Sequence, residues 1–360
     1  MLNFLVKRTL NGVVILFGVI VLIFVLFNIL PADPARMAMG QRSDEKSLEA
    51  IRKDMGLDKP AFSRFLKFID DLSVISIHET KNTESFFYFN PAIYKPFHKI
   101  FKIGKSKALY IKYPYMRRSY QSKKPVFPMI KDALVNTFIL AFSAIFIASV
   151  IGIIFGIISA VKKDSFIDRL LLFVSALGMS VPSFFAAILV GWIFAYVLGD
   201  ITGLNLTGNI TEIDDFGEGE YIAIKNLILP ALTLSVRPLS VFLQLTRNSV
   251  LDVLSQDYIR TARSKGLSQF QILKNHVLRN ALNPVITSIS GWFASLMAGV
   301  VFIEYIFGWK GLGYLVVDAL GNFDIPLIMG CILTIAFIFI IINILVDIIY
   351  AMLDPRIRLA

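Results

Sequence analysis

The stretch LIMGCILTIAFIFIIINILVDIIY, residues 327–350, decides the fold class, because its 24 residues include a single charge, Asp347. An α-helix rises about 1.5 Å per residue, so a run of this length can cross a hydrocarbon core of roughly 30 Å. A nearly charge-free core helix of a soluble protein is seldom so long. The stretch therefore predicts a transmembrane helix.

Five other apolar runs of comparable length follow the same pattern. They are residues 10–30, 133–161, 170–198, 227–246 and 284–302. Mean hydropathy is +0.68 and only 17% of residues are charged, against about 25% in an average soluble protein. The sequence therefore predicts an all-α integral membrane protein with about six transmembrane helices.

The charges of the short connections predict the orientation. Lys7 and Arg8 precede the first run, and residues 199–221 hold six acidic residues and no Lys or Arg. Since Lys and Arg are retained on the cytoplasmic side, both termini and the basic connection 247–279 are expected there. Pro31-Ala-Asp-Pro34 is a poor cleavage site, so the first run is predicted to be a retained anchor rather than a signal peptide.

Four segments result from these runs. They are a first transmembrane helix (1–30), an outer hydrophilic segment (31–129), a core of five transmembrane helices with a loop at 247–283 (130–350), and a cytoplasmic tail (351–360). The outer segment holds 19 Lys/Arg against 10 Asp/Glu residues. Its basic character is compatible with an outer location, because the charge rule weakens for loops longer than about 60 residues.

Two features are expected within the outer segment. Ser43 precedes two acidic residues, and Gly56 and Pro60 follow, so residues 44–55 are predicted to form a short surface helix. Residues of about 74–112 are rich in Lys, Phe and Tyr without a clear period. They form an apparent insertion, an added lobe rather than a membrane span.

The loop between the fourth and fifth apolar runs has two predicted helices with defined ends. Residues up to Lys265 suit a helix that Gly266 ends in a left-handed turn. Ser268 and Gln271 then form an S-x-x-Q capping box for a second helix. A plain linker between spans needs neither signal, so this loop is expected to be a folded element.

The second helix of this loop is predicted to have one apolar face. Phe270, Leu273 and Val277 recur at i, i+3 and i+7, with Lys274 and Arg279 elsewhere. Such a face could dock onto another protein. It could equally pack against the chain's own helices, as amphipathic surface helices usually do. The pattern alone leaves both interpretations open.

Several kinds of site find no support in the sequence. Three scattered histidines (His78, His98 and His276) and one cysteine, Cys331, do not assemble a metal site. The net charge of +10 comes without a recognisable nucleic-acid-binding module. Neither a metal nor a nucleic acid is therefore expected.

ATP hydrolysis is expected to come from another chain. Gly104-Lys105-Ser106 ends like a phosphate-binding loop, but Lys99 occupies the upstream glycine position. Gly311-Leu-Gly313 lacks the third glycine of a dinucleotide fingerprint. The chain is not expected to be an enzyme.

An ion-coupled secondary transporter is the alternative function. Such carriers hold paired ionisable groups inside the bilayer. Here Arg237 lies mid-span and Asp347 near the inner end of the last run, with no obvious partner for either. An intramembrane enzyme using Ser180, Ser183 and Asp347 is less favoured, because no nucleophile–base pairing can be named.

Residues 258–284, YIRTARSKGLSQFQILKNHVLRNALNP, resemble the EAA-type coupling loop of bacterial ABC importer permeases, in the version of the dipeptide/oligopeptide/nickel family. The likeness extends over most of the chain. Further matching stretches are ILPADPARMAMG (29–40), MGLDKP (55–60), SYQSKKPVFPMI (119–130), SVPSFF (180–185), LILPALTL (227–234), EYIFGWKGLG (304–313) and NILVDIIYAMLDPRIR (343–358). Their shared order makes the resemblance specific.

The resemblance implies a permease subunit for uptake of short peptides, or of a related solute such as nickel or glutathione. It implies a multi-pass location in the bacterial cytoplasmic membrane, surrounded by lipid. The implied partners are a second, homologous permease, two cytoplasmic ATPase subunits and an extracytoplasmic substrate-binding protein. No cofactor is expected in this chain, since ATP and Mg would be bound by the ATPase subunits.

The resemblance also implies which residues couple transport to ATP hydrolysis. Those expected in the coupling region that enters a cleft of the ATPase subunit are Tyr258, Arg260, Ala262, Lys265 and Gly266. Those matching the second half of the loop are His276, Arg279 and Asn280.

Arg237, Ser180 and Pro182 are the candidate pathway residues. An arginine at a helix centre costs about +2.5 to +3.5 kcal/mol on insertion scales, so Arg237 must face protein or water. Pro238 follows it and removes a helix hydrogen-bond donor. Arg237 either pairs with neighbouring carbonyls or a partner subunit, or lines the pathway and steers a peptide carboxylate.

Overall fold

The computed structural model describes residues 2–30, 35–36, 45–54, 56–83, 85–214, 217 and 219–353. The chain divides into two compact units. The first unit comprises Met1–Leu10, Asp132–Tyr314 and Ile335–Ala360, and the second comprises Asn11–Lys131 and Leu315–Thr334. The predicted division at residue 130 falls inside a continuous helix, α5 (Val126–Val161), and the predicted domain ranges stay a prediction.

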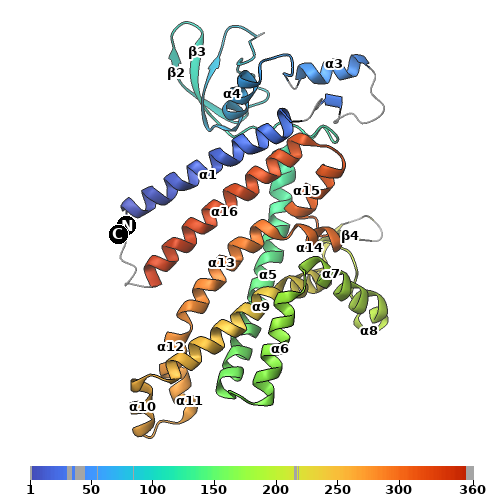
Figure 1. The fold of residues 1–360 in the computed structure, drawn as a ribbon. Helices are drawn as coiled ribbons and strands as arrows, with labels where there is room; N and C mark the ends of the chain where they lie inside the picture. The colour runs from blue at the N-terminus through green and yellow to red at the C-terminus, as the bar shows by residue number, and fades with distance from the viewer. Residues whose placement is uncertain are drawn as a thin grey trace. The chain divides into compact units, whose positions relative to one another are not determined.

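Four long helices confirm four of the predicted spans (Figure 1). They are α1 (Leu2–Asn28), α5, α9 (Lys225–Leu254) and α16 (Ile325–Leu353). α9 continues through Pro230 and Pro238, so the second proline does not interrupt the helix at Arg237. Long apolar runs favour helices of this length, which satisfy their backbone hydrogen bonds within the membrane.

The predicted span 170–198 is bent. Its first part is α6 (Phe166–Ser180). Its second part is α7 (Ser183–Gly191), which continues as the π-helix η1 (Trp192–Val197). The axes of the two parts meet at 107°. Pro182 causes the break, because a proline disfavours the helical conformation of the residue before it. Val181 accordingly has an extended backbone, with φ −76° and ψ 127°.

The predicted span 284–302 is also divided. It forms α13 (Asn283–Gly299), whose 17 residues lie at the short limit of about 17 for a spanning helix. α14 (Val301–Ile306) and α15 (Leu312–Gly321) follow. Among the described residues, four helices are long and apolar enough to span a membrane, or up to five if α6 and α7 form one span.

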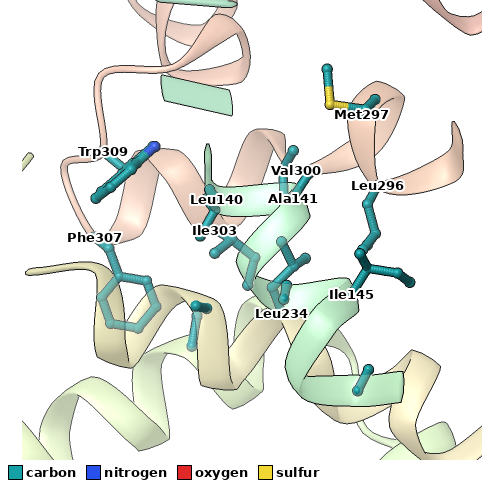
Figure 2. Packing of buried hydrophobic residues seen from close by; sticks show 14 of the residues in the cluster. Leu140, Ala141, Ile145, Leu234, Leu296, Met297, Val300, Ile303, Phe307 and Trp309 are labelled. Carbon is teal, nitrogen blue, oxygen red and sulfur yellow. The ribbon is translucent and has the colours of Figure 1, made fainter. Parts of the chain in front are cut away.

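A hydrophobic cluster joins α5, α7, α9, α13 and α14 in the first unit. Figure 2 shows Leu140 and Ile145 of α5 beside Leu234 of α9, with Ile303 and Phe307 approaching from the C-terminal part of the unit. Trp309 is fully buried, and its ring nitrogen donates to the Asn136 carbonyl at 2.9 Å. This core fixes the helices that carry the candidate site.

α5 and α9 approach each other closely at a glycine. A Cβ atom at Gly156 would lie 2.5 Å from Thr246 Cβ and 2.7 Å from the Leu243 carbonyl oxygen. Both distances are too short for a real side chain, so only glycine permits this packing. Small residues allow membrane helices to pack backbone against backbone.

Short elements complete the first unit. Gly203, at φ +62°, follows α8 (Gly199–Thr202), and β4 (Thr211–Ile213) pairs antiparallel with β5 (Glu220–Ile222). These strands lie in the acidic connection that was expected outside. Asn226 accepts a hydrogen bond from Asn205 and donates to Glu212, tying this connection to the start of α9.

The second unit holds the outer segment. The predicted surface helix is α3 (Glu45–Asp54), and Gly56 at φ +66° follows it, as expected; the predicted end residues Asp44 and Met55 lie outside the described residues. α4 (Ala61–Leu72) was not predicted. The apparent insertion near 74–112 forms an antiparallel sheet of β1 (Ile75–Glu79), β2 (Phe97–Ile103) and β3 (Lys107–Lys112), with β3 in the centre.

Candidate functional site

The predicted coupling loop folds as a hook, residues 257–281, at one end of α9 (Figure 1). It consists of α10 (Asp257–Ser264), α11 (Gln269–Ile272), the π-helix η2 (Leu273–Val277) and α12 (Leu278–Ala281). The two predicted helices are therefore present. The second is interrupted by a π-helical turn that the sequence pattern did not indicate.

Gly266 ends the first helix of the hook as predicted. Its φ is +78°, its amide donates to the Arg263 carbonyl at 3.0 Å, and the Leu267 amide donates to the Ala262 carbonyl at 3.4 Å. These two bonds form a Schellman motif, which requires a left-handed residue at this position. A Cβ at Gly266 would meet nothing within 4 Å, so within this chain the glycine is needed for its conformation alone.

The predicted capping box starts the second helix. The Ser268 hydroxyl accepts from the Gln271 amide at 3.3 Å, and the Gln271 side-chain oxygen accepts from the Ser268 amide at 2.9 Å. The reciprocal bonds satisfy two amides that a helix start leaves unpaired. Both ends of the turn between the helices are thus fixed by local hydrogen bonds.

The apolar face predicted for the second helix of the hook is wrong at Phe270. Phe270 is 71% exposed, whereas Ile272, Val277 and Ala281 are buried. The π-helical turn adds a residue between Ile272 and Val277, so the buried positions recur at five and then four residues. The buried face packs on Ile259 and Ala262 of α10, Val250 of α9 and Ala160 of α5.

The hook therefore has one side packed on its own chain and another exposed. Tyr258 is 44% exposed, and Arg260, Lys265, Arg279 and Asn280 are also exposed. Arg260 forms an exposed ion pair with Asp257 at 3.3 Å. Ala262 is buried, so it holds α10 in place and presents no surface to a partner.

One hydrogen bond brings together the two halves of the predicted coupling set. The Asn280 side-chain amide donates to the Tyr258 hydroxyl at 3.1 Å and to the His276 carbonyl at 3.3 Å. His276 lies half-buried in η2. Residues separated by about twenty positions thus share one surface, which the sequence alone did not show.

The candidate pathway residues lie on neighbouring helices. Ser180 is the last residue of α6, with its hydroxyl donating to the Ala176 carbonyl at 2.8 Å, and Pro182 precedes α7 at the bend. Arg237 is exposed on α9. α6 packs on α9, where Gln244 donates to Ser175 at 2.9 Å. Within the described chain, no hydrogen bond or ion pair links Arg237 to Ser180 or Pro182.

Two buried carboxylates were missed by the sequence reasoning. Asp168 accepts two hydrogen bonds from the Arg247 guanidinium, at 2.7 and 2.8 Å, and one from Ser159. Glu304 is fully buried and accepts from the Thr137 hydroxyl at 2.6 Å and the Gly313 amide at 2.7 Å. Glu304 stands in the quoted EYIFGWKGLG stretch, where a lone acid beside an apolar run was the available signal.

The expectation that Asp347 lacks a partner is also wrong. Arg8 of α1 lies 3.1 Å from the Asp347 carboxylate, an ion pair between residues 339 positions apart that sequence spacing cannot reveal. The described residues contain no group of three or more His, Cys, Asp or Glu side chains able to hold a metal ion.

Comparisons with known proteins identify the family. Residues 152–359 match the model of the binding-protein-dependent transport system inner membrane component, and residues 1–86 match that of its N-terminal part. A putative peptide transport system permease protein of Brucella abortus (strain 2308) is 34% identical over 98% of both chains. A glutathione transport system permease protein of Escherichia coli (strain K12) is 32% identical over 99% of both chains.

The fold has a relative among solved structures. The chain is similar to one from inward-facing conformations of the MetNI methionine ABC transporter, with a TM-score of 0.50, 14% identity, and coverage of 63% of this chain and 97% of that one. The apolar helices of the present chain make it a multi-pass membrane protein. Both family models and the full-length relatives agree, and the chain belongs to the binding-protein-dependent transport system inner membrane components, as a permease subunit of an ABC importer.

Proposed function

We propose that the chain forms part of the transmembrane pathway for uptake of short peptides. Relatives named for peptide, dipeptide and glutathione transport support this substrate class, since glutathione is itself a tripeptide. A substrate-binding protein delivers the solute from outside. This chain pairs with a second, homologous permease, and two ATPase subunits bind ATP and Mg²⁺ on the cytoplasmic side.

The hook carries the proposal. Its exposed residues, Tyr258, Arg260, Lys265, Arg279 and Asn280, form the proposed contact with an ATPase subunit, and Gly266 and the capping box fix their positions. The buried side of the hook packs on α9 and α5. A displacement of the hook therefore moves these two helices, which changes the access of the pathway.

Both termini and the hook are proposed to be cytoplasmic, with the sheet of the second unit outside. Single-cysteine labelling in a Cys331→Ser background tests this topology. A cysteine at Ser106, between β2 and β3, should react with an impermeant reagent from outside. A cysteine at Gln269 in α11 should react only in inverted vesicles. Labelling of position 106 only from the cytoplasm would contradict the topology.

Substitutions at Gly266 test coupling. Gly266→Val opposes the left-handed turn, because a β-branched residue strongly disfavours positive φ, whereas Gly266→Asn tolerates it. We expect Gly266→Val to insert normally but to lose ATPase binding and ATP-dependent peptide uptake in proteoliposomes. Gly266→Asn should retain much of both. Wild-type uptake by Gly266→Val would show that the hook packs only on its own chain.

The same proteoliposomes separate this function from ion coupling. Peptide uptake should require ATP, the ATPase subunits and the binding protein. Uptake driven by a proton or sodium gradient without the ATPase subunits would contradict the proposed mechanism.

A further inference from the structure

The second unit contains a cavity of about 400 Å³ for which the importer assignment gives no role. Four cationic side chains line it, Lys67, Arg117, Arg118 and Lys123, against one acidic side chain, Asp71. Its aromatic walls are Phe86, Tyr94, Tyr115 and Tyr120. Ligand sites commonly have this form, with apolar walls and a few polar groups.

The acid in the wall is already engaged. The Asp71 carboxylate accepts from the Tyr94 hydroxyl at 2.7 Å and lies 3.5 Å from Lys67 Nζ and 3.7 Å from Arg117 Nε. In the described part of the chain, the side chains of Arg118 and Lys123 make no hydrogen bond or ion pair. The cavity therefore keeps an excess of positive charge.

The loop that bears these cations is held in a fixed conformation. Arg117 and Lys123 have φ +62° and +60°, a region that side chains other than glycine seldom adopt. Buried Asp324 anchors the loop, because its carboxylate accepts from the Ser119 hydroxyl and, at 3.0 Å, from the Tyr120 amide. Backbone strain persists where the surrounding structure enforces it, which is most common at functional sites.

A second hollow, of about 470 Å³, adjoins the first. The two share Ile93, Tyr94, Tyr115, Arg117 and Arg118, and the second is also lined by Pro96, Pro114, Pro125 and Pro128. Aromatic and proline rings thus line the two hollows on either side of Arg117 and Arg118, and Lys95 adds a further cation to the second hollow. An extended chain of a few residues with a terminal negative charge fits these features.

We propose that this cavity binds the C-terminal carboxylate of a short peptide, with Arg118 and Arg117 as donors and the rings packed against the peptide chain. Arginine suits this role, because its planar guanidinium donates two parallel hydrogen bonds to a carboxylate. The identity of the ligand rests on the proposed peptide function. The site itself rests on the cavity, its charge and its anchored loop.

Equilibrium dialysis tests the site on the full-length permease in lipid nanodiscs. The probes are radiolabelled trialanine and its C-terminal amide, which lacks the negative charge. We expect trialanine to bind at least about tenfold more tightly, as loss of a charge-assisted hydrogen bond implies. Arg118→Gln should reduce its affinity to that of the amide, and Arg118→Lys should restore only part of it.

Lys124→Gln is the matched control, because Lys124 is an exposed residue of the same loop that does not line the cavity. It should leave the affinity unchanged. A melting curve for each variant checks that the fold is intact. Equal binding of trialanine and its amide, or an Arg118→Gln variant with wild-type affinity, would overturn the proposal.

Two further outcomes are distinguished. If wild-type permease binds neither probe but binds the peptide-free binding protein through Arg118, the cavity accepts a carboxylate of that partner and the proposal is wrong. Peptide uptake is measured in parallel on wild-type proteoliposomes. If the wild-type permease shows no peptide uptake but still binds trialanine, the proposed function is wrong and the proposed binding site remains supported.

Discussion

The Asn280 amide donates to the Tyr258 hydroxyl at 3.1 Å and so joins the two halves of the hook. A neutral hydrogen bond contributes about 0.5–1.5 kcal/mol, so Tyr258→Phe and Asn280→Ala should each weaken ATPase binding about two- to tenfold. The double variant should be no weaker than the more harmful single one, because both remove the same bond. A double-mutant cycle on ATPase affinity measures this coupling.

Ser264→Ala serves as the control for that cycle. Ser264 is also exposed on α10, and its hydroxyl donates only to the Arg260 carbonyl, at 3.1 Å. We expect ATPase affinity close to wild type. Strictly additive effects of the Tyr258 and Asn280 substitutions would show that the bond does not organise the docking surface.

Arg237→Gln should lower peptide uptake at least about tenfold while ATPase binding stays intact, since the loss of a charged donor to a carboxylate costs about 1.5–3 kcal/mol. Arg237 is exposed on α9 and has no hydrogen-bond or ion-pair partner in the described chain, which leaves its guanidinium available to a solute. Lys225→Gln, at the start of the same helix, should transport normally. Unchanged uptake kinetics in Arg237→Gln would remove Arg237 from the pathway.

The sheet of the second unit should lose stability in acid through His78. Burial, together with the ammonium groups of Lys67 and Lys112, lowers the pKa of His78 from 6.5 to about 4. Between these values the unfolded chain binds more protons than the folded one, so stability falls as pH decreases from about 6.5 towards 4. Proteolysis of residues 75–112, followed at stepped pH values, measures this loss.

His78→Gln should flatten that pH dependence, because glutamine does not titrate. Asp70 lies 3.4 Å from His78, and burial raises the pKa of its carboxyl, so protonation of Asp70 changes the stability in the opposite direction, adding stability as pH falls. Asp70→Asn separates the two contributions. An unchanged slope near pH 6 in His78→Gln would assign the acid sensitivity to another group.

Gly156→Ala should destabilise the permease by about 1–3 kcal/mol, the usual cost of overpacking a filled contact. The added Cβ would collide with Thr246 and the Leu243 carbonyl. A lower melting temperature of the detergent-solubilised protein measures the effect. Gly291→Ala in α13 is the control, because a Cβ there meets nothing within 4 Å. Equal melting temperatures for the two variants would contradict close packing of α5 and α9.

The sequence predicted those parts of the fold that depend on local signals. Gly266, the Ser268–Gln271 capping box and the long apolar runs each act through neighbouring residues, and the structure has all of them. The 107° bend also has a local cause, Pro182, which stood in the sequence as an available signal. Its significance was missed because the apolar run continues across it.

The remaining features depend on contacts between distant residues. β3 buries Ala108, Tyr110 and Lys112 on one face, and the lysine obscures the apolar alternation of a strand. Lys112 is tolerated there because its ammonium donates to the carbonyls of Asp70 and Asp71 at 2.7 and 3.0 Å. The π-helical turn at 273–277 likewise shifts the buried face of the hook without a signal in the sequence.

The bend at Val181–Pro182 restricts what can surround it in the membrane. α7 begins without a side-chain cap, and the amides of Ser183, Phe184 and Phe185 have no acceptor in the described chain. Non-helical backbone at membrane depth is tolerated only where it is covered by protein or lines a water-filled space. The amides at the start of α7 therefore face either a partner subunit or a water-filled space, and not the lipid tails.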